Sequence, residues 1–349
     1  MRAPQDILNA KARTMRTLMP TDFQPLGLNP WPRFAGISTF MRLPHVPLDD
    51  ARAKELDIAL VGVPFDQGVT NRTGPRHGPR QIRDQSSIIR RFHRVHNLSP
   101  FDLANCADIG DTPVNPADLP DALERISGHY ALMKTMGIRP LSAGGDHLIS
   151  LPILRALAKN GPVGMVHFDS HTDLYDEYFG GFKITHGTPF RRAIEEGLLD
   201  PKRVIQIGIR GSMYNSDDHA WGLEQGVRIV FIEEYFEKGP EVIVKEARRV
   251  IGDKPAYLSF DVDGIDPTFT PGTGTPEIGG YTPADAQRML RGLLGINLIG
   301  ADVVEVSPPF DASGGTALVA ANLMFEILCL MAAGPGKRKA ADAGKGTKK

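Results

Sequence analysis

The chain has 349 residues, a formal net charge of −1 and 41% hydrophobic residues. This length and apolar content are enough for one large α/β domain, or two smaller ones, with a sizeable core. The near-zero net charge gives no electrostatic reason to expect a nucleic acid or a membrane as partner. Two cysteines, Cys106 and Cys329, are too few for a disulfide framework, and no Cys-x-x-Cys zinc pattern occurs.

The two ends of the chain differ from the part between them. The first residues lack the apolar stretch of a signal peptide, so we expect a reducing, cytoplasmic location. A transit peptide is the alternative, suggested by basic residues with little acid: Arg2, Lys11, Arg13 and Arg16. We expect an N-terminal arm (1–56), a catalytic domain (57–331) and a disordered basic tail (332–349).

Strand-like apolar runs alternate with helical patterns from residue 57 onward. Strands are predicted at 57–64, 140–143, 165–168, 203–209, 227–231 and 256–260, with a further one beginning at residue 298. Helices are predicted from residue 78 and at 121–136, 150–159, 240–251, 283–294 and 317–331. This order predicts a single-domain, three-layer α/β/α fold with a mainly parallel sheet. Ligands in such folds bind at the carboxyl ends of the strands.

Three of the predicted strands end in residues of the types that commonly bind metals, aspartate and histidine. The 140–143 strand leads into Gly144-Gly145-Asp146-His147, where the glycines allow close backbone approach to a ligand. His147 alone would more often be an ordinary loop histidine. The 165–168 strand ends in Asp169-Ser170-His171-Thr172-Asp173. Full extension would spread these side chains along about 13 Å, so the strand end must curl for them to converge.

The third such strand, 256–260, runs into Asp261 and Asp263. An isolated Asp-x-Asp-Gly is usually a solvated turn. Beside the preceding motif, however, these acids would crowd other carboxylates and raise their pKa values unless a cation compensates the charge. The strand that begins at residue 298 adds Asp302 and Glu305 among apolar neighbours. A buried ionised acid there must find a cation or hydrogen-bond donors.

The chain lacks the G-x-G-x-x-G and G-x-x-x-x-G-K-[ST] nucleotide fingerprints and the G-x-S-x-G nucleophile elbow. It resembles instead the ureohydrolases, the arginase and agmatinase family. The resemblance rests on Gly144–His147, Asp169–Asp173, Ser259–Pro267 and the continuation Pro271–Pro276. The agmatinase branch, which includes guanidinobutyrase and guanidinopropionase, is more similar than arginase because of residues 271–280.

The resemblance implies a binuclear metal site in which Asp169 and Asp261 bridge the two ions. The implied ligands are His147, Asp169, His171, Asp173, Asp261 and Asp263. Family habit implies two Mn²⁺ ions per subunit, although the same ligands accept Ni²⁺ or Co²⁺. Such an ion pair activates water for attack on a guanidinium carbon.

The resemblance also assigns three catalytic residues. Glu305 binds the substrate guanidinium through a charge-assisted contact. Asp173 relays a proton to the leaving amine, and His186, within Thr185–Phe190, shuttles protons near neutral pH. The expected products are urea, or a urea-like fragment, and an amine.

The substrate class stays open between guanidino acids, such as 4-guanidinobutanoate and 3-guanidinopropanoate, and agmatine. Residues 174–183 are expected at the entrance, where Lys183 favours an acid and Asp176 with Glu177 favours a cation. Aromatic residues there also allow an alkylated guanidine or biguanide such as metformin. In the 71–80 loop, Asn71 or Arg76 are candidates to bind the distal end of the substrate.

Two rival functions remain to be distinguished. A deacetylase of similar fold would use a single Zn²⁺, which the extra ligands His147, Asp173 and Asp263 argue against. An inactive subunit paired with an active paralogue is the alternative from another class. The resemblance further implies a homo-oligomer, commonly a trimer or hexamer, with a small-molecule substrate and neither nucleic acid nor membrane as partner.

Overall fold

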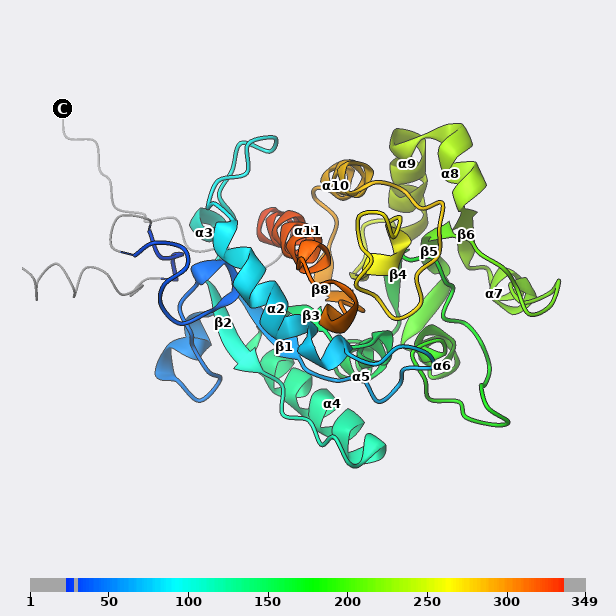
Figure 1. Cartoon of the computed structure of the whole chain (residues 1–349), viewed down its shortest axis with the longest axis horizontal. Coiled ribbons are helices and arrows are strands. Elements are labelled where there is room, and N and C mark those ends of the chain that lie inside the picture. The colour runs from blue at the N-terminus through cyan, green and yellow to red at the C-terminus, as the bar shows by residue number, and fades with distance from the viewer. Residues whose placement is uncertain (1–22, 28–30, 336–349) are drawn as a thin grey trace, which may run out of the picture.

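A computed structural model describes residues 23–27 and 31–335 of the chain. Its centre is an eight-stranded sheet in the order β2-β1-β3-β8-β7-β4-β5-β6, and every neighbouring pair is parallel. The strands are β1 (Ile58–Val63), β2 (Cys106–Asp111), β3 (Arg139–Gly144), β4 (Val163–Phe168), β5 (Leu199–Ile209), β6 (Arg228–Phe231), β7 (Ala256–Asp261) and β8 (Leu298–Val304). Figure 1 shows the sheet enclosed by helices.

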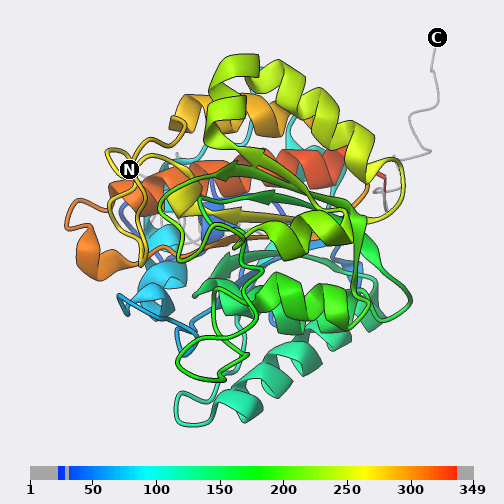
Figure 2. The same cartoon turned by 90° about the vertical axis from the view of Figure 1, so that its right-hand side faces the viewer.

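Helices cover both faces of the sheet, and Figure 2 shows the three layers in side view. One face carries α2 (Gly78–Gln85), α3 (Pro100–Leu103), α8 (Ile232–Lys238), α9 (Pro240–Ile251), α10 (Pro283–Gly292) and α11 (Gly315–Ala333). The other carries α4 (Leu119–Met136), α5 (Ser150–Leu157), α6 (Pro189–Glu195) and α7 (Ala220–Gln225). Each face encloses its own apolar core. The predicted single-domain α/β/α fold with a parallel sheet is therefore confirmed.

Local sequence signals explain where the main elements begin and end. All six residues of β1, Ile-Ala-Leu-Val-Gly-Val, are buried, as expected for a strand covered on both faces. Helix α4 begins after Asp118, whose side chain accepts a hydrogen bond from the backbone N–H of Asp121, and it ends at Gly137 with φ of 76°. Helix α10 begins with a capping box formed by Thr282 and Asp285.

Some elements were not predicted from the sequence. These are the edge strand β2 and the short helices α3, α6, α7 and α8. Helix α11 is long and apolar enough to cross a membrane, but 78% of its most apolar window is buried inside the protein, as in the core helix of a globular domain. The basic residues that suggested a transit peptide as the alternative, and nearly all of the expected basic tail, lie outside the described residues.

Candidate active site

The predicted metal ligands follow three strands in the middle of the sheet. His147 opens a short 3-10 turn after β3, Asp169 follows β4, and Asp261 ends β7. Strand β8, which leads to Glu305, lies between β3 and β7. The four strands β3, β8, β7 and β4 are consecutive neighbours, so their carboxyl ends bring these side chains together at one edge of the sheet.

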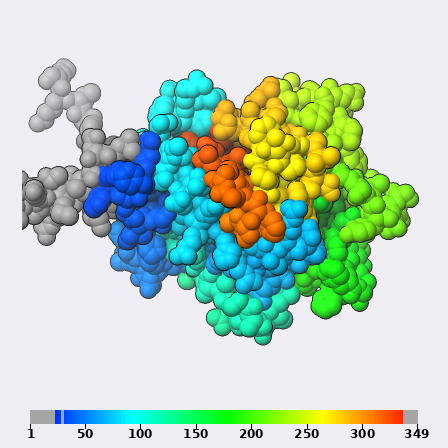
Figure 3. All heavy atoms as spheres, in the orientation of Figure 1, coloured from blue at the N-terminus to red at the C-terminus, as the bar shows by residue number. Residues whose placement is uncertain are grey.

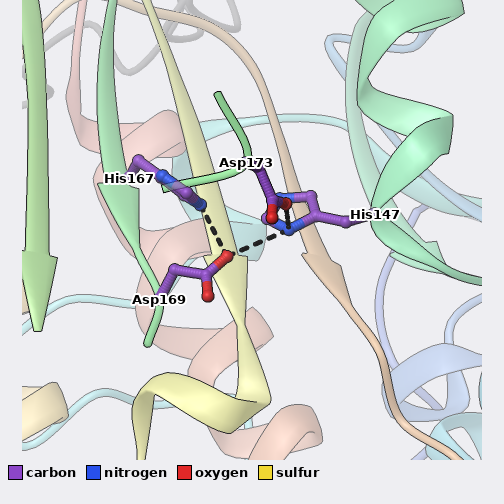
Figure 4. A group of neighbouring side chains, drawn as sticks. All are labelled: His147, His167, Asp169 and Asp173. Atoms are coloured by element: carbon purple, nitrogen blue, oxygen red, sulfur yellow. Dashed lines mark hydrogen bonds and ion pairs between the residues drawn. The ribbon is translucent and has the colours of Figure 1, made fainter. Parts of the chain in front are cut away.

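A first group of ligands surrounds the Nδ1 atom of His147, and Figure 4 shows part of it. Nδ1 lies 2.9 Å from Asp173 Oδ2, 3.1 Å from Asp169 Oδ2 and 3.3 Å from Asp261 Oδ2. The atom is buried, yet it makes no hydrogen bond of proper geometry. Ligands that share one ion at bond lengths of about 2.1 Å stand roughly 3.0–3.4 Å apart. The spacing therefore fits a cation among these atoms.

A second group forms around His171. Its Nδ1 lies 3.1 Å from Asp263 Oδ2 and 3.5 Å from Asp169 Oδ1. Asp169 thus directs Oδ2 to the first group and Oδ1 to the second, as the predicted bridging role requires. Asp261 contacts the first group through Oδ2, while its Oδ1 accepts a hydrogen bond from the backbone N–H of Asp263. These contacts place all six predicted ligands in one cluster.

The carboxylates and imidazoles of this cluster shift one another's pKa values. Burial alone would lower the pKa of His147, but the surrounding carboxylates raise that pKa well above its usual value. The pKa of Asp261 is also raised well above its usual value, by burial and by the neighbouring charges of Asp263 and Asp169. Carboxylates and imidazoles that compete for protons in this way form a donor set suited to divalent cations.

Glu305 and His186 lie beside the first group. Glu305 Oε1 accepts hydrogen bonds from the backbone N–H of His147 and from His186 Nδ1, both at 2.9 Å. Burial alone would lower the pKa of His186, but the charge of Glu305 raises it to about 9. This contact favours the imidazolium, whereas the backbone N–H of Thr70, 3.1 Å from His186 Nε2, can donate to that atom only in the neutral ring. The sequence suggested a pKa near neutrality. A competing cation at Glu305 would weaken the preference for the imidazolium.

The other carboxylate oxygen of Glu305, Oε2, is buried and accepts no hydrogen bond from any described residue. Gly274 faces it, and a Cβ atom on this glycine would lie 3.4 Å from Oε2. A buried carboxylate oxygen without a donor is unfavourable by about 1–3 kcal/mol. It is therefore a candidate acceptor for a donor that a ligand supplies.

The backbone is strained at two of these residues. Asp173 has φ of 52° and Glu305 has φ of 65°, in the left-handed region that residues other than glycine rarely adopt. Such strain concentrates at functional sites, where the surrounding structure maintains it. In both residues the carboxylate points toward His147. Asp173 Oδ2 lies 2.9 Å from His147 Nδ1, and Glu305 Oε1 accepts a hydrogen bond from the backbone N–H of His147.

A cavity of about 410 Å³ opens onto the cluster. Five predicted site residues line the cavity: His147, His171, Asp173, His186 and Asp261. The rest of its wall is formed by Thr70, Asn71, Arg72, Tyr175, Tyr178, Gly187, Ser212, Met213, Tyr214, Thr275, Pro276 and Glu277. The segments before α2, after β7 and after β8 meet on one face of the molecule (Figure 3). Gly74, before α2, packs there beside Ser307, after β8. A larger hollow of about 600 Å³, near Trp31, contains none of the predicted site residues.

Several residues that the sequence placed at the entrance lie elsewhere. Arg76 forms an ion pair with the buried Asp66 at 2.5 Å. Lys183 and Asp176 lie 3.6 Å apart and do not line the cavity, and Asp176 also pairs with Arg192 at 2.7 Å. The outer wall of the cavity does include Asn71, Tyr175 and Tyr178, as the sequence suggested. It also includes Arg72, from the loop singled out in the sequence, and Tyr214 and Glu277, which the sequence did not indicate.

His167 is a site residue that sequence reasoning missed. Its Nε2 lies 2.8 Å from Asp169 Oδ2 (Figure 4), and its Nδ1 lies 3.0 Å from the side-chain amide nitrogen of Gln206. The side chain is completely buried. A histidine inside the apolar run Met165–Phe168 was the available signal, because a buried imidazole needs polar partners.

Comparisons with known proteins agree with this geometry. The sequence model of the arginase family matches residues 56–330. The chain is 59% identical to guanidinopropionase of Pseudomonas aeruginosa and 52% identical to guanidinobutyrase of the same organism. Each alignment spans 309 residues, which is 88% of this chain and 96% of the relative.

A solved structure is similar over nearly its whole length. Proclavaminate amidino hydrolase of Streptomyces clavuligerus superposes with a TM-score of 0.82 at 38% identity, covering 86% of this chain and 99% of that one. The sequence match and the parallel sheet with acidic strand ends lead to the same conclusion. The chain belongs to the arginase family.

Proposed function

We propose that this protein is a binuclear-metal amidinohydrolase, which hydrolyses a C–N bond of a guanidino compound to urea and an amine. The observation that carries the proposal is a cavity onto which His147, His171, Asp173 and Asp261 open, together with the buried, unpaired Oε2 of Glu305, whose Oε1 binds the backbone N–H of His147. A guanidinium offers several N–H donors and a positive charge, which together suit a buried carboxylate. The names of the relatives in the same family, guanidinopropionase and guanidinobutyrase, support this substrate class.

Two divalent ions fit the cluster, and we propose Mn²⁺, with Ni²⁺ as the alternative. His147, Asp173 and the bridging Asp169 and Asp261 would hold one ion. His171, Asp263 and Asp169 would hold the other, and the family resemblance adds Asp261 as its second bridging ligand. When bound, such a pair lowers the pKa of water and supplies a nucleophile at neutral pH.

The residues of the chain orient the substrate and move protons. Glu305 would hold the guanidinium through Oε2 while its Oε1 stays bound to the backbone of His147. The positive charge of the substrate would compete with His186 for this carboxylate, which lowers the pKa of His186 toward neutrality. His186 would then be able to give a proton to the departing amine. Asp173, with Oδ2 beside His147, is the second group placed to relay that proton.

We propose a guanidino acid as the substrate rather than agmatine. Arg72 is the only lysine or arginine among the described residues that line the cavity, and none of the described carboxylates forms an ion pair with it. Its guanidinium stacks over the ring of Phe310, with 4.9 Å between Cζ and the ring centre. An unpaired arginine at the cavity favours a substrate whose distal end is a carboxylate.

The experiment that tests this function is urea and amine release by the Mn²⁺- or Ni²⁺-loaded chain. The panel is agmatine, 4-guanidinobutanoate, 3-guanidinopropanoate, arginine, guanidine and metformin. We expect one guanidino acid to be hydrolysed best by the isolated chain. If the chain with two ions bound hydrolyses none of these compounds, the proposal is contradicted. Activity only after addition of a paralogue would favour the inactive-subunit alternative.

The variant Glu305→Gln tests the guanidinium site, because it keeps the shape of the side chain and removes its charge. We expect this variant to bind both ions and to lose turnover by at least about 100-fold, because a neutral amide no longer attracts the guanidinium. Full activity of Glu305→Gln would show that the guanidinium binds elsewhere.

A further inference from the structure

A chain of hydrogen bonds leads from His147 into the interior of the sheet, on the side of the ring opposite to the ligand atom Nδ1. His147 Nε2 lies 2.7 Å from Ser259 Oγ, and Ser259 Oγ lies 2.6 Å from Asp302 Oδ1. Ser259 on β7 and Asp302 on β8 are direct register partners. None of the three side chains is more than 1% exposed, so water does not compete for these contacts.

The direction of the chain follows from the donors available. Asp302 Oδ2 accepts hydrogen bonds from Ser150 Oγ and Tyr257 OH, both at 2.6 Å. An ionised carboxylate can only accept, so the single hydroxyl hydrogen of Ser259 goes to Asp302 Oδ1. The oxygen of Ser259 is then left as an acceptor toward His147. The network therefore assigns the hydrogen of the neutral imidazole to Nε2 and leaves the lone pair on Nδ1.

We propose that Ser259 and Asp302 are positioning residues that select the metal-binding tautomer of His147 and fix the orientation of its ring. This inference rests on the proposed function, because it concerns the uptake of one of the two ions. The other tautomer would place an N–H at the atom surrounded by Asp169, Asp173 and Asp261, and this hydrogen would exclude a cation. Partners of this kind typically change metal affinity by about 10- to 100-fold.

The histidine of the second metal-ligand group, His171, has no comparable hydrogen-bond network. His171 Nδ1 lies 3.0 Å from Ser170 Oγ, and no described side chain forms a hydrogen bond with its Nε2. Its side chain is 30% exposed, against 1% for His147. The network therefore acts on one position of the pair, and loss of the network should weaken mainly the ion held by His147.

Two variants interrupt the network in different ways. Ser259→Ala removes the hydrogen-bond acceptor of His147 Nε2, so that neither tautomer of His147 is favoured. In Asp302→Asn, the amide oxygen is expected to stay where the two hydroxyls of Ser150 and Tyr257 donate. The amide NH₂ then faces Ser259 and donates to it, so the serine hydrogen turns to His147 Nε2 and favours the wrong tautomer.

Two further variants serve as controls. Tyr257→Phe removes a donor to the same carboxylate but no atom between Asp302 and His147. Ser259→Thr keeps the hydroxyl and should restore what Ser259→Ala loses. Each purified, metal-free variant is titrated with Mn²⁺, and free Mn²⁺ is followed by electron paramagnetic resonance to obtain two stepwise affinities. Thermal unfolding of each metal-free variant reports whether the fold is intact.

We expect Ser259→Ala to weaken one of the two Mn²⁺ affinities by about 10-fold and Asp302→Asn by about 100-fold, while Tyr257→Phe and Ser259→Thr stay within about 3-fold of the parent chain. Unchanged affinities in Ser259→Ala, or an equal loss in Tyr257→Phe, would overturn the positioning role. If Asp302→Asn does not fold, the two Ser259 variants decide. A parent chain that binds fewer than two ions would instead overturn the proposed function, and this inference with it.

Discussion

At the scale of single residues, Asp169 should matter for both ions and Asp263 for one. Asp169 contacts His147 through Oδ2 and His171 through Oδ1, whereas of these two histidines Asp263 contacts His171 alone. Asp169→Asn is expected to abolish loading of at least one ion and to weaken the other, and Asp263→Asn to remove one. The measurement is metal content after dialysis against Mn²⁺.

Asp266 provides the matched control for this comparison. It belongs to the same acidic loop, but its carboxylate accepts hydrogen bonds from the backbone N–H groups of Thr268 and Gly279 instead of facing the cluster. Asp266→Asn should therefore keep two ions. Equal metal loss in all three variants would show that the loop collapses and that the assignment of individual ligands is unsupported.

Arg72 carries the prediction on substrate class. Arg72→Met should raise KM for 3-guanidinopropanoate or 4-guanidinobutanoate by about 10- to 100-fold with little change in kcat, since a contact to a charged group contributes about 1.5–3 kcal/mol. Hydrolysis of agmatine should not suffer. Steady-state kinetics on both substrate types measure this, with Arg80→Met, an exposed arginine on α2 that does not line the cavity, as control. An unchanged KM for the acids would exclude Arg72 as the carboxylate partner.

The sequence predicted which residues could bind metal but not how each is held. Acidic and histidine residues at strand ends were visible as motifs. The left-handed backbone of Asp173 and Glu305 was not, because no glycine or asparagine marks those positions. His167 and Ser259 were also missed as partners. His167 contacts Asp169 two residues along the same segment, but its buried surroundings come from the sheet, and Ser259 reaches His147 only because β8 brings β7 close to β3.

At the scale of elements, the start of α11 depends on one carboxylate. Asp311 accepts hydrogen bonds from the backbone N–H groups of Ser313, Gly314 and Thr316 and from Ser313 Oγ. Burial alone would raise the pKa of Asp311, but these donors lower it to about 2. A lowered folded-state pKa stabilises the protein fully above the unfolded value of about 3.9. This stabilisation decreases as the pH falls from about 4 toward 2.

Asp311→Asn should therefore lower the free energy of unfolding by about 1 kcal/mol at pH 7, within the range for lost helix caps. The difference from the parent chain should shrink as the pH decreases below about 4, because the parent loses the same charge. Urea denaturation at pH 7, 5 and 3 tests both statements, with Asp118→Asn at the start of α4 as a second cap for comparison. A difference independent of pH would mean that charge at Asp311 does not contribute.

Elements were predicted where one local signal dominates. The buried strands β1, β4 and β7 show continuous apolar runs, and α9 and α10 begin with proline in the first turn. The edge strand β2 was missed because Cys-Ala-Asp-Ile-Gly-Asp contains acids that look like a loop. Asp108 within β2 is buried, where Arg83 of α2 pairs with it at 2.8 Å and the backbone N–H groups of Phe40 and Gly110 donate to it. No local pattern reveals the contacts with Arg83 and Phe40.

At the scale of the whole molecule, the segment before β1 presents apolar surface that none of the described residues covers. Phe34 is 93% exposed and Ile37 is 89% exposed. Burying a large apolar side chain gains about 1.5–3 kcal/mol, so the pair favours contact with another copy of the chain. We expect an oligomer in which this segment is buried at a subunit interface.

The double variant Phe34→Glu with Ile37→Glu tests this expectation, because two buried charges without partners would destabilise such an interface by several kcal/mol. Sedimentation velocity should show a smaller particle than for the parent chain, with metal content unchanged since neither residue lines the cavity. Phe236→Glu is the matched control, because Phe236 is exposed and belongs to α8. Helix α8 lies at the opposite end of the molecule from the segment before β1 (Figure 1). If the parent chain sediments as a monomer, or if the double variant keeps the parent's size, the exposed pair does not mediate assembly.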